Sequence, residues 1–306
     1  MLSIICISLV LVFIILHSYY KKQSRIEYVT RNDILLENNP IKPLLLEYLV
    51  KIRSSEIKFK TGRSDIPKDD LLDFYIDHIQ NFKKDERDII KKYIYLVQKY
   101  CDKFPKIKDS YWRFIKLSPN LDKGMPFTLG DYIFISSDFI KKLKKSINNS
   151  DNIKHCDTII HEQIHIIQRN YPTIFNKFYK SLGIKRASRI VLTNYWKNRH
   201  LQNPDGMNIN WIYKNEGLYY LPLLTHNNGQ LEQVVIRLNQ IGKDAYKTTT
   251  DYKNIYRFPF FKDLANDISP YHPNELSAYI IPKLILYPQK YRVRFYRKFI
   301  QFLEFL

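Results

Sequence analysis

The 306-residue sequence predicts an α+β protein. Helical and strand-like patterns occur in blocks rather than in strict alternation, which is typical of that class. Hydrophobic residues make up 45% and charged residues 26% of the chain, and three cysteines are too few for a disulfide scaffold. We predict three segments: a membrane anchor over residues 1–20, a helical region over 21–110, and a mixed body over 111–306.

The N-terminal segment has the composition of a membrane-spanning helix. Residues 2–16 are almost entirely apolar, and Lys21, Lys22 and Arg25 follow. As a helix, residues 2–20 would span about 28 Å, enough to cross a bilayer core. A basic n-region and a small-residue cleavage site are both missing, which favours a signal-anchor over a cleaved signal peptide. The positive-inside rule then predicts a single-pass membrane protein with its body on the cytosolic side.

The region before residue 110 is predicted to be helical. Three stretches place apolar side chains at helical spacing, at residues 41–52, 68–82 and 85–100. Pro105 marks the end of this pattern. We therefore expect a helical lead-in that precedes the mixed body.

The body begins with strand-like patterns and then becomes helical. Two runs read as strands, 111–117 and 127–135, the second interrupted by Gly130-Asp131. A helix is predicted over 150–168, ending before Pro172, and residues 173–200 continue helically.

The second half of the body alternates like a sheet and ends in helices. Strands are predicted at 209–213, 218–224 and 231–238, separated by turn sequences. Helices are predicted at 274–287 and 289–306.

The net charge of +19 raises three partner classes: nucleic acid, anionic membrane and acidic substrate. Ile, Lys and Asn are over-used, which is typical of AT-rich genomes, including those of large DNA viruses, so codon bias accounts for part of the basic excess. The basic runs at 141–145 and 290–298 read as solvated helix faces. The sequence has no RRM signature, zinc-finger spacing or P-loop, and we expect no specific nucleic-acid partner.

The sequence His161-Glu162-Gln-Ile-His165 carries the strongest chemical signal. On a helix, residues i and i+4 project from one face, so the two imidazoles can bind one Zn²⁺. Glu162 lies beside the metal and can take a proton from water and pass it to a leaving amine. This is the H-E-x-x-H zinc-peptidase motif.

A catalytic zinc site needs a third protein ligand. Glu275 lies in the first turn of a predicted helix opened by Pro273-Asn274, where the helix dipole favours a carboxylate. Small side chains at Ser277 and Ala278 permit close packing against the motif helix. Three other residues remain alternatives for the third ligand: Glu216, Glu232 and His272.

These residues resemble the zincin metallopeptidases, and within them the gluzincins, in which a glutamate near the start of a downstream helix completes the site. The resemblance implies that His161, His165 and Glu275 bind one zinc ion per chain and that Glu162 is the general base. It also implies that the strand-like run at 127–135 binds the substrate backbone as an added strand. The 110-residue gap between His165 and Glu275 is longer than in many gluzincins, and the metzincin extension is absent.

A tetrahedral intermediate needs a hydrogen-bond donor besides the metal. Tyr279 is four residues after Glu275, on the same helical face, and is the first candidate for this catalytic role. The others are Tyr271, Tyr219, Tyr220 and His226.

The sequence therefore predicts a membrane-anchored zinc metallopeptidase that cleaves peptides or proteins, in a host-cell or virion membrane if the source is viral. Two alternatives stay open: a non-enzymatic membrane or virion component that retains a zincin-like fold, and a basic nucleic-acid-binding protein. The sequence gives no oligomeric state.

Overall fold

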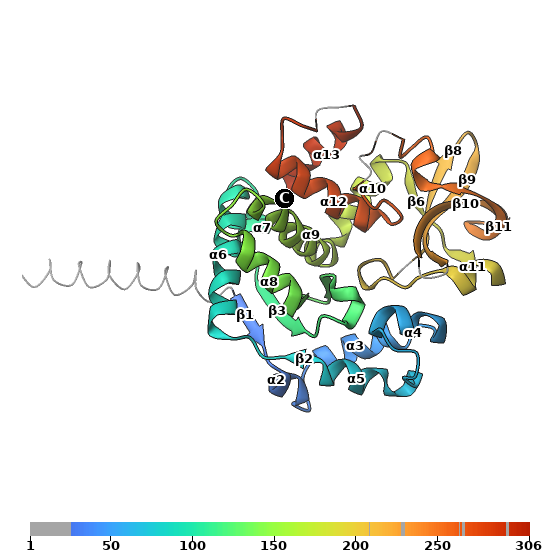
Figure 1. Cartoon of the computed structure of the whole chain (residues 1–306). Helices are drawn as coiled ribbons and strands as arrows, with labels where there is room; N and C mark the ends of the chain where they lie inside the picture. The colour runs from blue at the N-terminus through green and yellow to red at the C-terminus, as the bar shows by residue number, and fades with distance from the viewer. Residues whose placement is uncertain (1–25, 208, 228–229, 263, 265–266, 292–293) are drawn as a thin grey trace, which may run out of the picture.

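A computed structural model describes residues 26–207, 209–227, 230–262, 264, 267–291 and 294–306 (Figure 1). Helices and two sheets share this part of the chain, and the predicted α+β class is confirmed. The predicted helices at 41–52, 85–100, 150–168 and 274–287 form, with ends shifted by a few residues.

The first sheet, sheet A, has the order β1-β3-β5-β4, and β2 also pairs with β3. Its strands are β1 (Ile26–Val29), β2 (Ile79–Gln80), β3 (Trp112–Leu117), β4 (Phe127–Leu129) and β5 (Tyr132–Ser136). β1, β3 and β5 are parallel, whereas β4 and β5 form an antiparallel hairpin. Gly130 has a φ of 53° at the hairpin turn, a conformation that glycine adopts without strain. Both strand predictions, including the interruption, are confirmed.

Helices cover both faces of sheet A. α6 (Lys84–Tyr100), α8 (Ser137–Ser146) and α9 (Asn152–Asn170) share one core with Ile133 and Ile135. α2 (Arg31–Leu35), α3 (Ile41–Leu49), α4 (Ser54–Thr61) and α5 (Leu71–Asp77) lie on the other side, and the core there includes Phe134. Alternate residues of β5 therefore enter opposite cores, as expected for a strand buried on both faces.

The second sheet, sheet B, has the order β6-β8-β9-β10-β11-β7. Its strands are β6 (Ile184–Arg186), β7 (Arg189–Val191), β8 (Trp211–Asn215), β9 (Leu218–Asn227), β10 (Gln230–Gly242) and β11 (Ala245–Asn254). The three predicted strands are confirmed as β8, β9 and β10, and β11 was not predicted. The helical prediction for 173–200 is wrong in part, because only α10 (Pro172–Ser181) and α11 (Asn194–Arg199) are helical there and β6 and β7 lie between them.

The C-terminal helices complete the core that α9 and α10 share. α12 (Pro273–Leu286) runs beside α9, and α13 (Arg297–Phe302) closes the same core through Phe299 and Phe302 (Figure 1). The prediction of one helix over 289–306 is wrong in part, since α13 is flanked by short 3-10 turns. The remaining short helices are α7 (Pro105–Lys108), η1 (Lys68–Asp70), η2 (Leu121–Gly124), η3 (Pro204–Gly206), η4 (Ile255–Arg257), η5 (Arg294–Tyr296) and η6 (Leu303–Phe305).

The predicted transmembrane helix falls within residues 1–25, outside the described residues. Among the helices that the structure describes, none is long and apolar enough to cross a membrane. The longest of them, α9, has 19 residues but carries charged side chains, including Lys154, Asp157 and Arg169. We therefore correct the predictions of a membrane-spanning element in the fold, of a signal-anchor, and of a single-pass membrane protein with a cytosolic body.

The region before residue 110 contributes strands to sheet A and a helix to the core of the body. β1 pairs with β3 in parallel, and α6 lies in the same core as α9. The predicted division at residue 110 therefore runs through sheet A.

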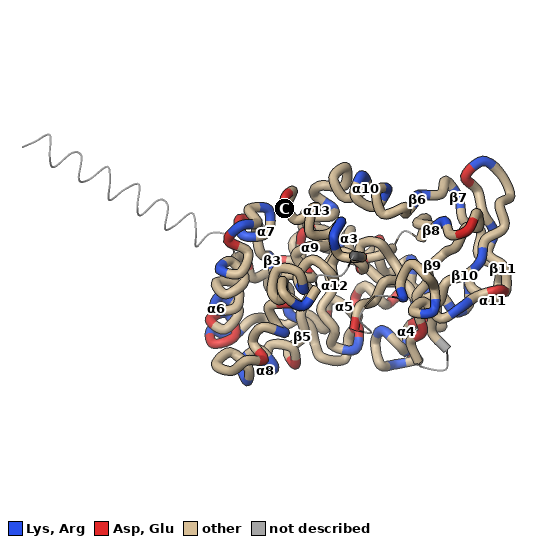
Figure 2. Tube along the Cα trace, turned by 90° about the horizontal axis from the view of Figure 1, so that it is seen from above, with Lys and Arg blue, Asp and Glu red and all other residues tan. Residues whose placement is uncertain are grey.

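Basic residues are spread over the molecule and mixed with acidic ones (Figure 2). Several form surface ion pairs, such as Lys144 with Asp85 on α6 and Arg31 with Asp77 on α5. The high net charge is thus distributed over many elements of the fold.

Candidate metal site

α9 presents the two motif histidines from one face. His165 is fully buried and His161 nearly so, and their Nε2 atoms lie 3.1 Å apart. The apolar side of the same helix, with Ile160, Ile164 and Ile167, is buried in the core and fixes the rotation of the helix. The spacing of the motif therefore brings both imidazole nitrogens to a single point.

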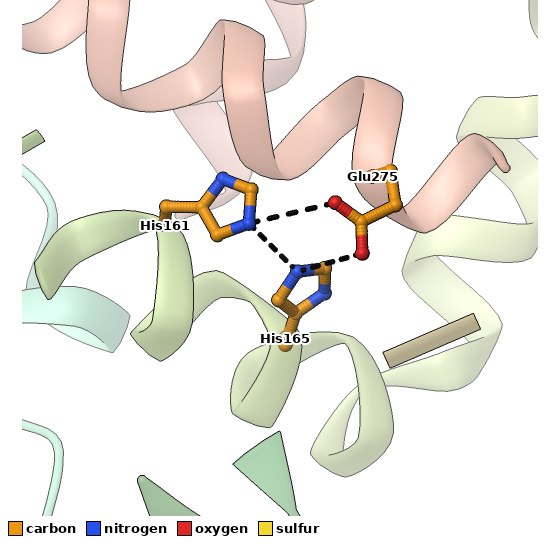
Figure 3. A group of neighbouring side chains, drawn as sticks. All are labelled: His161, His165 and Glu275. Atoms are coloured by element: carbon orange, nitrogen blue, oxygen red, sulfur yellow. Dashed lines mark hydrogen bonds and ion pairs between the residues drawn. The ribbon is translucent and has the colours of Figure 1, made fainter. Parts of the chain in front are cut away.

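α12 brings Glu275 to that point from the opposite side (Figure 3). Its Oε2 lies 3.5 Å from Nε2 of His161, and its Oε1 lies 3.5 Å from Nε2 of His165. Glu275 stands in the first turn of α12, where the His272 side chain caps the helix by accepting from the Asn274 N–H. Ser277 and Ala278 are fully buried at the contact with α9, as predicted for close helix packing.

The Gln168 side chain determines which ring nitrogen of His165 carries the proton. Its Nε2 donates to the Asn274 carbonyl and to the Ser277 hydroxyl, both at 2.9 Å. Its Oε1 is therefore free to accept from Nδ1 of His165, 2.9 Å away. With the proton on Nδ1, the Nε2 lone pair faces His161 and Glu275.

His161, His165 and Glu275 form a cluster that could hold a metal ion, since one ligand atom from each lies within 4.8 Å of the others. We call these residues the metal triad. Burial lowers the pKa of His161 well below its ordinary value and lowers that of His165 to about 3. Both imidazoles are therefore neutral at physiological pH, the state in which a histidine binds a metal.

Glu162 lies beside the metal triad with one oxygen unsatisfied. The residue is 4% exposed, and its Oε2 has no hydrogen-bond partner among the described residues. Burial raises the pKa of Glu162 well above its ordinary value, and the carboxylates of Asp205 and Glu275 raise it further. A buried acceptor without a partner costs free energy, and such groups are concentrated at functional sites.

A cavity of about 410 Å³ opens onto the metal triad. Its wall includes His161, Glu162 and Glu275, together with residues of α4, α12 and sheet B. Tyr279 also lines it, with its ring centroid 4.5 Å from that of His161. Burial raises the pKa of Tyr279, so its hydroxyl keeps its proton and can donate a hydrogen bond.

Asp205 is a site residue that the sequence did not reveal. It is buried, and its Oδ1 accepts from the Thr128 N–H at 3.1 Å and pairs with Arg169 at 3.8 Å. Burial raises the pKa of Asp205, and Arg169 opposes that shift. The sequence Asn203-Pro-Asp-Gly reads as a turn, and nothing near it in the chain signals that Asp205 enters the site.

Asn203 of the same turn was also missed. Its Nδ2 donates to Glu275 Oε1 at 3.0 Å and to the Tyr271 hydroxyl. Gln168, by contrast, lies three residues after His165 on the same helical face, and that spacing is a signal for a partner of a metal ligand.

The alternative third ligands lie elsewhere. Glu216 is exposed in the turn between β8 and β9, and Glu232 is exposed on β10. His272 caps α12 as described above. Among the other candidate donors, Tyr271 lies against Asn203, whereas Tyr219 contacts Tyr246 within sheet B.

No protein family model, curated protein or solved structure matches the chain.

Proposed function

We propose that the chain is a zinc-dependent metallopeptidase that hydrolyses peptide bonds. The observation that carries the proposal is the convergence of two neutral imidazoles and one carboxylate on a single point. Beside it, in an open cavity, Glu162 has one oxygen that no described residue hydrogen-bonds. Two histidines and one glutamate are a ligand set that zinc enzymes use while keeping one coordination position open.

The spacing of the donor atoms fits zinc. Bonds of 2.0–2.1 Å in a tetrahedral arrangement place neighbouring ligand atoms about 3.3 Å apart. The two imidazole Nε2 atoms lie 3.1 Å apart, and each lies 3.5 Å from one Glu275 oxygen, Oε2 for His161 and Oε1 for His165. The soft ligands that select copper(I), and the all-oxygen sets that select calcium or magnesium, are not present in the triad.

Glu162 supplies proton transfer in this proposal. A bound zinc ion would act as a Lewis acid on water and on the peptide carbonyl. Glu162 lines the cavity, and its Oε2 has no hydrogen-bond partner among the described residues, so the carboxyl group can accept the proton of the attacking water and deliver it to the leaving amine. Burial raises its pKa, the direction of shift found in carboxyl groups that act as general acids.

Tyr279 is proposed to stabilise the oxyanion. It stands on α12 one turn after Glu275, lines the cavity beside His161, and remains protonated. A phenol hydroxyl so placed can donate to the oxygen that gains charge during attack. Tyr279→Phe should then lower kcat more than it raises KM.

The experiment is zinc-dependent hydrolysis by the full chain. A chelator should abolish cleavage of a mixed peptide library, and added zinc should restore it, with products identified by mass spectrometry. Hydrolysis that persists after zinc is removed, or a zinc-loaded chain that cleaves no peptide, would contradict the proposal.

A further inference from the structure

β4 forms the edge of sheet A beside the metal triad, where a bound peptide would add as a further strand. The Thr128 N–H points away from β5, and Asp205 accepts from it at 3.1 Å with Oδ1 and 3.4 Å with Oδ2. The Thr128 hydroxyl also donates to Asp205. The Asp205 carboxylate thus occupies the position in which a carbonyl of an added strand would accept.

We call the stretch of β4 edge that is occupied by Asp205 the closure. Arg169 extends it along the β4–β5 hairpin. Its Nε donates to the Gly130 carbonyl at 2.8 Å, and its guanidinium also donates to the Thr128 hydroxyl. Asn274 donates to the backbone carbonyl of Asp205 at 3.3 Å, which ties the closure to α12. From Thr128 onward, the edge of β4 is therefore paired within the chain itself.

The opposite end of the edge is open. Met125, Pro126 and Phe127 line the cavity, which continues to Phe59 on α4. Asp205 lines the same cavity next to Glu162 and Glu275. A peptide bound at the metal triad therefore has room toward Met125, and its path past Thr128 is closed.

The direction of β4 decides which end of a peptide meets the closure. β4 runs from Phe127 toward Thr128, so a strand added antiparallel to it begins at the closed end and leaves past Phe127. Antiparallel pairing is slightly more stable per residue than parallel pairing. The N-terminus of the peptide would then lie at the closure.

The charge at the closed end agrees with this direction. The carboxyl groups of Asp205 and Glu162 line the cavity, and Glu162 Oε2 has no hydrogen-bond partner among the described residues. The Arg169 guanidinium is engaged by Gly130, Thr128 and Asp205. An α-ammonium group complements such a wall better than a carboxylate does.

We infer that the site removes residues from the N-terminus of a peptide, with Asp205 as the specificity-determining residue that faces the α-ammonium group. The inference rests on the proposed zinc-dependent hydrolysis. The peptide C–N bond breaks, water supplies the hydroxyl of the new carboxyl group, and a proton passes to the released amine. The closure limits the length of peptide on the N-terminal side of the cleaved bond.

The test compares three peptides of one sequence with the zinc-loaded full chain: free at both ends, N-acetylated, and C-amidated. The free and amidated peptides should lose N-terminal residues, and acetylation should lower kcat/KM about tenfold or more, because a charged hydrogen-bonded group is lost. Equal cleavage of the acetylated peptide, or trimming from the C-terminus, would overturn this inference alone. Cleavage of none of the three peptides would overturn the proposed function with it.

Asp205→Asn tests the residue itself. The amide oxygen can still accept from Thr128, so the closure is kept while the charge is removed. The KM of the free peptide should rise about tenfold with zinc content unchanged, so the ratio of free to acetylated cleavage should fall. Asp138→Asn on α8, where the exposed carboxylate pairs with Lys141, is the matched control and should leave KM unchanged. An unchanged ratio of free to acetylated cleavage in Asp205→Asn would overturn the role of Asp205.

Discussion

Two buried carboxylate groups line the same cavity, and they differ in how completely they are satisfied. Asp122 accepts from Lys60 at 2.7 Å, from Tyr48 at 3.1 Å and from Tyr75 at 2.8 Å. We call these four residues the Asp122 cluster. Beside the metal triad, Glu162 has an oxygen without a hydrogen-bond partner in the described part of the chain. The two imidazoles and Glu275 meet at one point next to it.

The difference separates a structural group from one prepared for a ligand. In the Asp122 cluster the charges cancel and both carboxylate oxygens are hydrogen-bonded, so the group is complete within the chain. Around the metal triad, burial raises the pKa of both Glu162 and Glu275 and lowers that of both histidines. A divalent cation bound there would relieve this cost.

The largest expected effect is the loss of activity when Glu162, beside the metal triad, is replaced. Glu162→Gln should lower kcat about 10²- to 10⁴-fold, because the amide cannot accept the proton of the attacking water. Zinc content should stay at the wild-type level, since Glu162 is not a ligand. Peptide hydrolysis and metal analysis on the same preparation check this, and wild-type kcat in the variant would remove Glu162 from the mechanism.

A substitution in the Asp122 cluster should instead lower the stability of the protein. Lys60→Met leaves Asp122 buried without its cation, which should lower the free energy of unfolding by about 3–5 kcal/mol. The matched control is Lys144→Met, which breaks the exposed pair with Asp85 and should cost less than about 1 kcal/mol. Denaturant titration measures both. Equal losses in the two variants would show that the Asp122 cluster does not have the role assigned to it.

Gln168 should affect metal affinity without being a ligand. Gln168→Ala removes the acceptor that fixes the His165 tautomer and should weaken zinc binding about 10- to 100-fold in competition titrations with a chelator. Gln163→Ala, a buried glutamine on the same helix outside the cavity wall, should leave zinc affinity unchanged. Equal losses of affinity in the two variants would point to general damage to α9.

A smaller effect concerns pH in the metal-free protein. Because burial raises the pKa of Glu162 above its ordinary 4.5, its contribution to stability is present at low pH and is lost as the pH rises from 4.5 toward the folded-state value. Glu162→Gln should therefore gain stability relative to wild type as the pH increases. Thermal unfolding of both zinc-free proteins between pH 5 and pH 8 tests this, and a difference independent of pH would contradict it.

The spacing of apolar residues predicted those elements whose structure depends mainly on their own local sequence. α3, α6, α9 and α12 each bury an apolar face that is visible at helical spacing. β11 was missed because its side chains are mostly polar and exposed and its pairing is supplied by β10. β6 and β7 have three residues each and pair with strands far along the chain.

The residues of the site also fall into two sets, those that a local sequence pattern predicts and those that only tertiary contacts bring in. The motif on α9 and the first-turn glutamate of α12 are local patterns, and the structure brings them together. Asp205 is held in the site by Thr128, 77 residues earlier, and by Arg169. In the sequence, an arginine near the end of a helix reads as a surface residue. Contacts of this kind depend on tertiary packing, which leaves no periodic trace in the sequence. The same holds for Asn203, whose contact with Glu275 joins residues 72 positions apart.

Metal analysis of the purified full chain tests the central claim most directly. Zinc should be bound at one ion per chain, X-ray absorption should give two nitrogen ligands and one carboxylate at about 2.0–2.2 Å, and His161→Ala or Glu275→Ala should reduce the zinc content sharply. A chain that binds no stoichiometric zinc, or a His161→Ala variant with unchanged zinc content, would contradict the account.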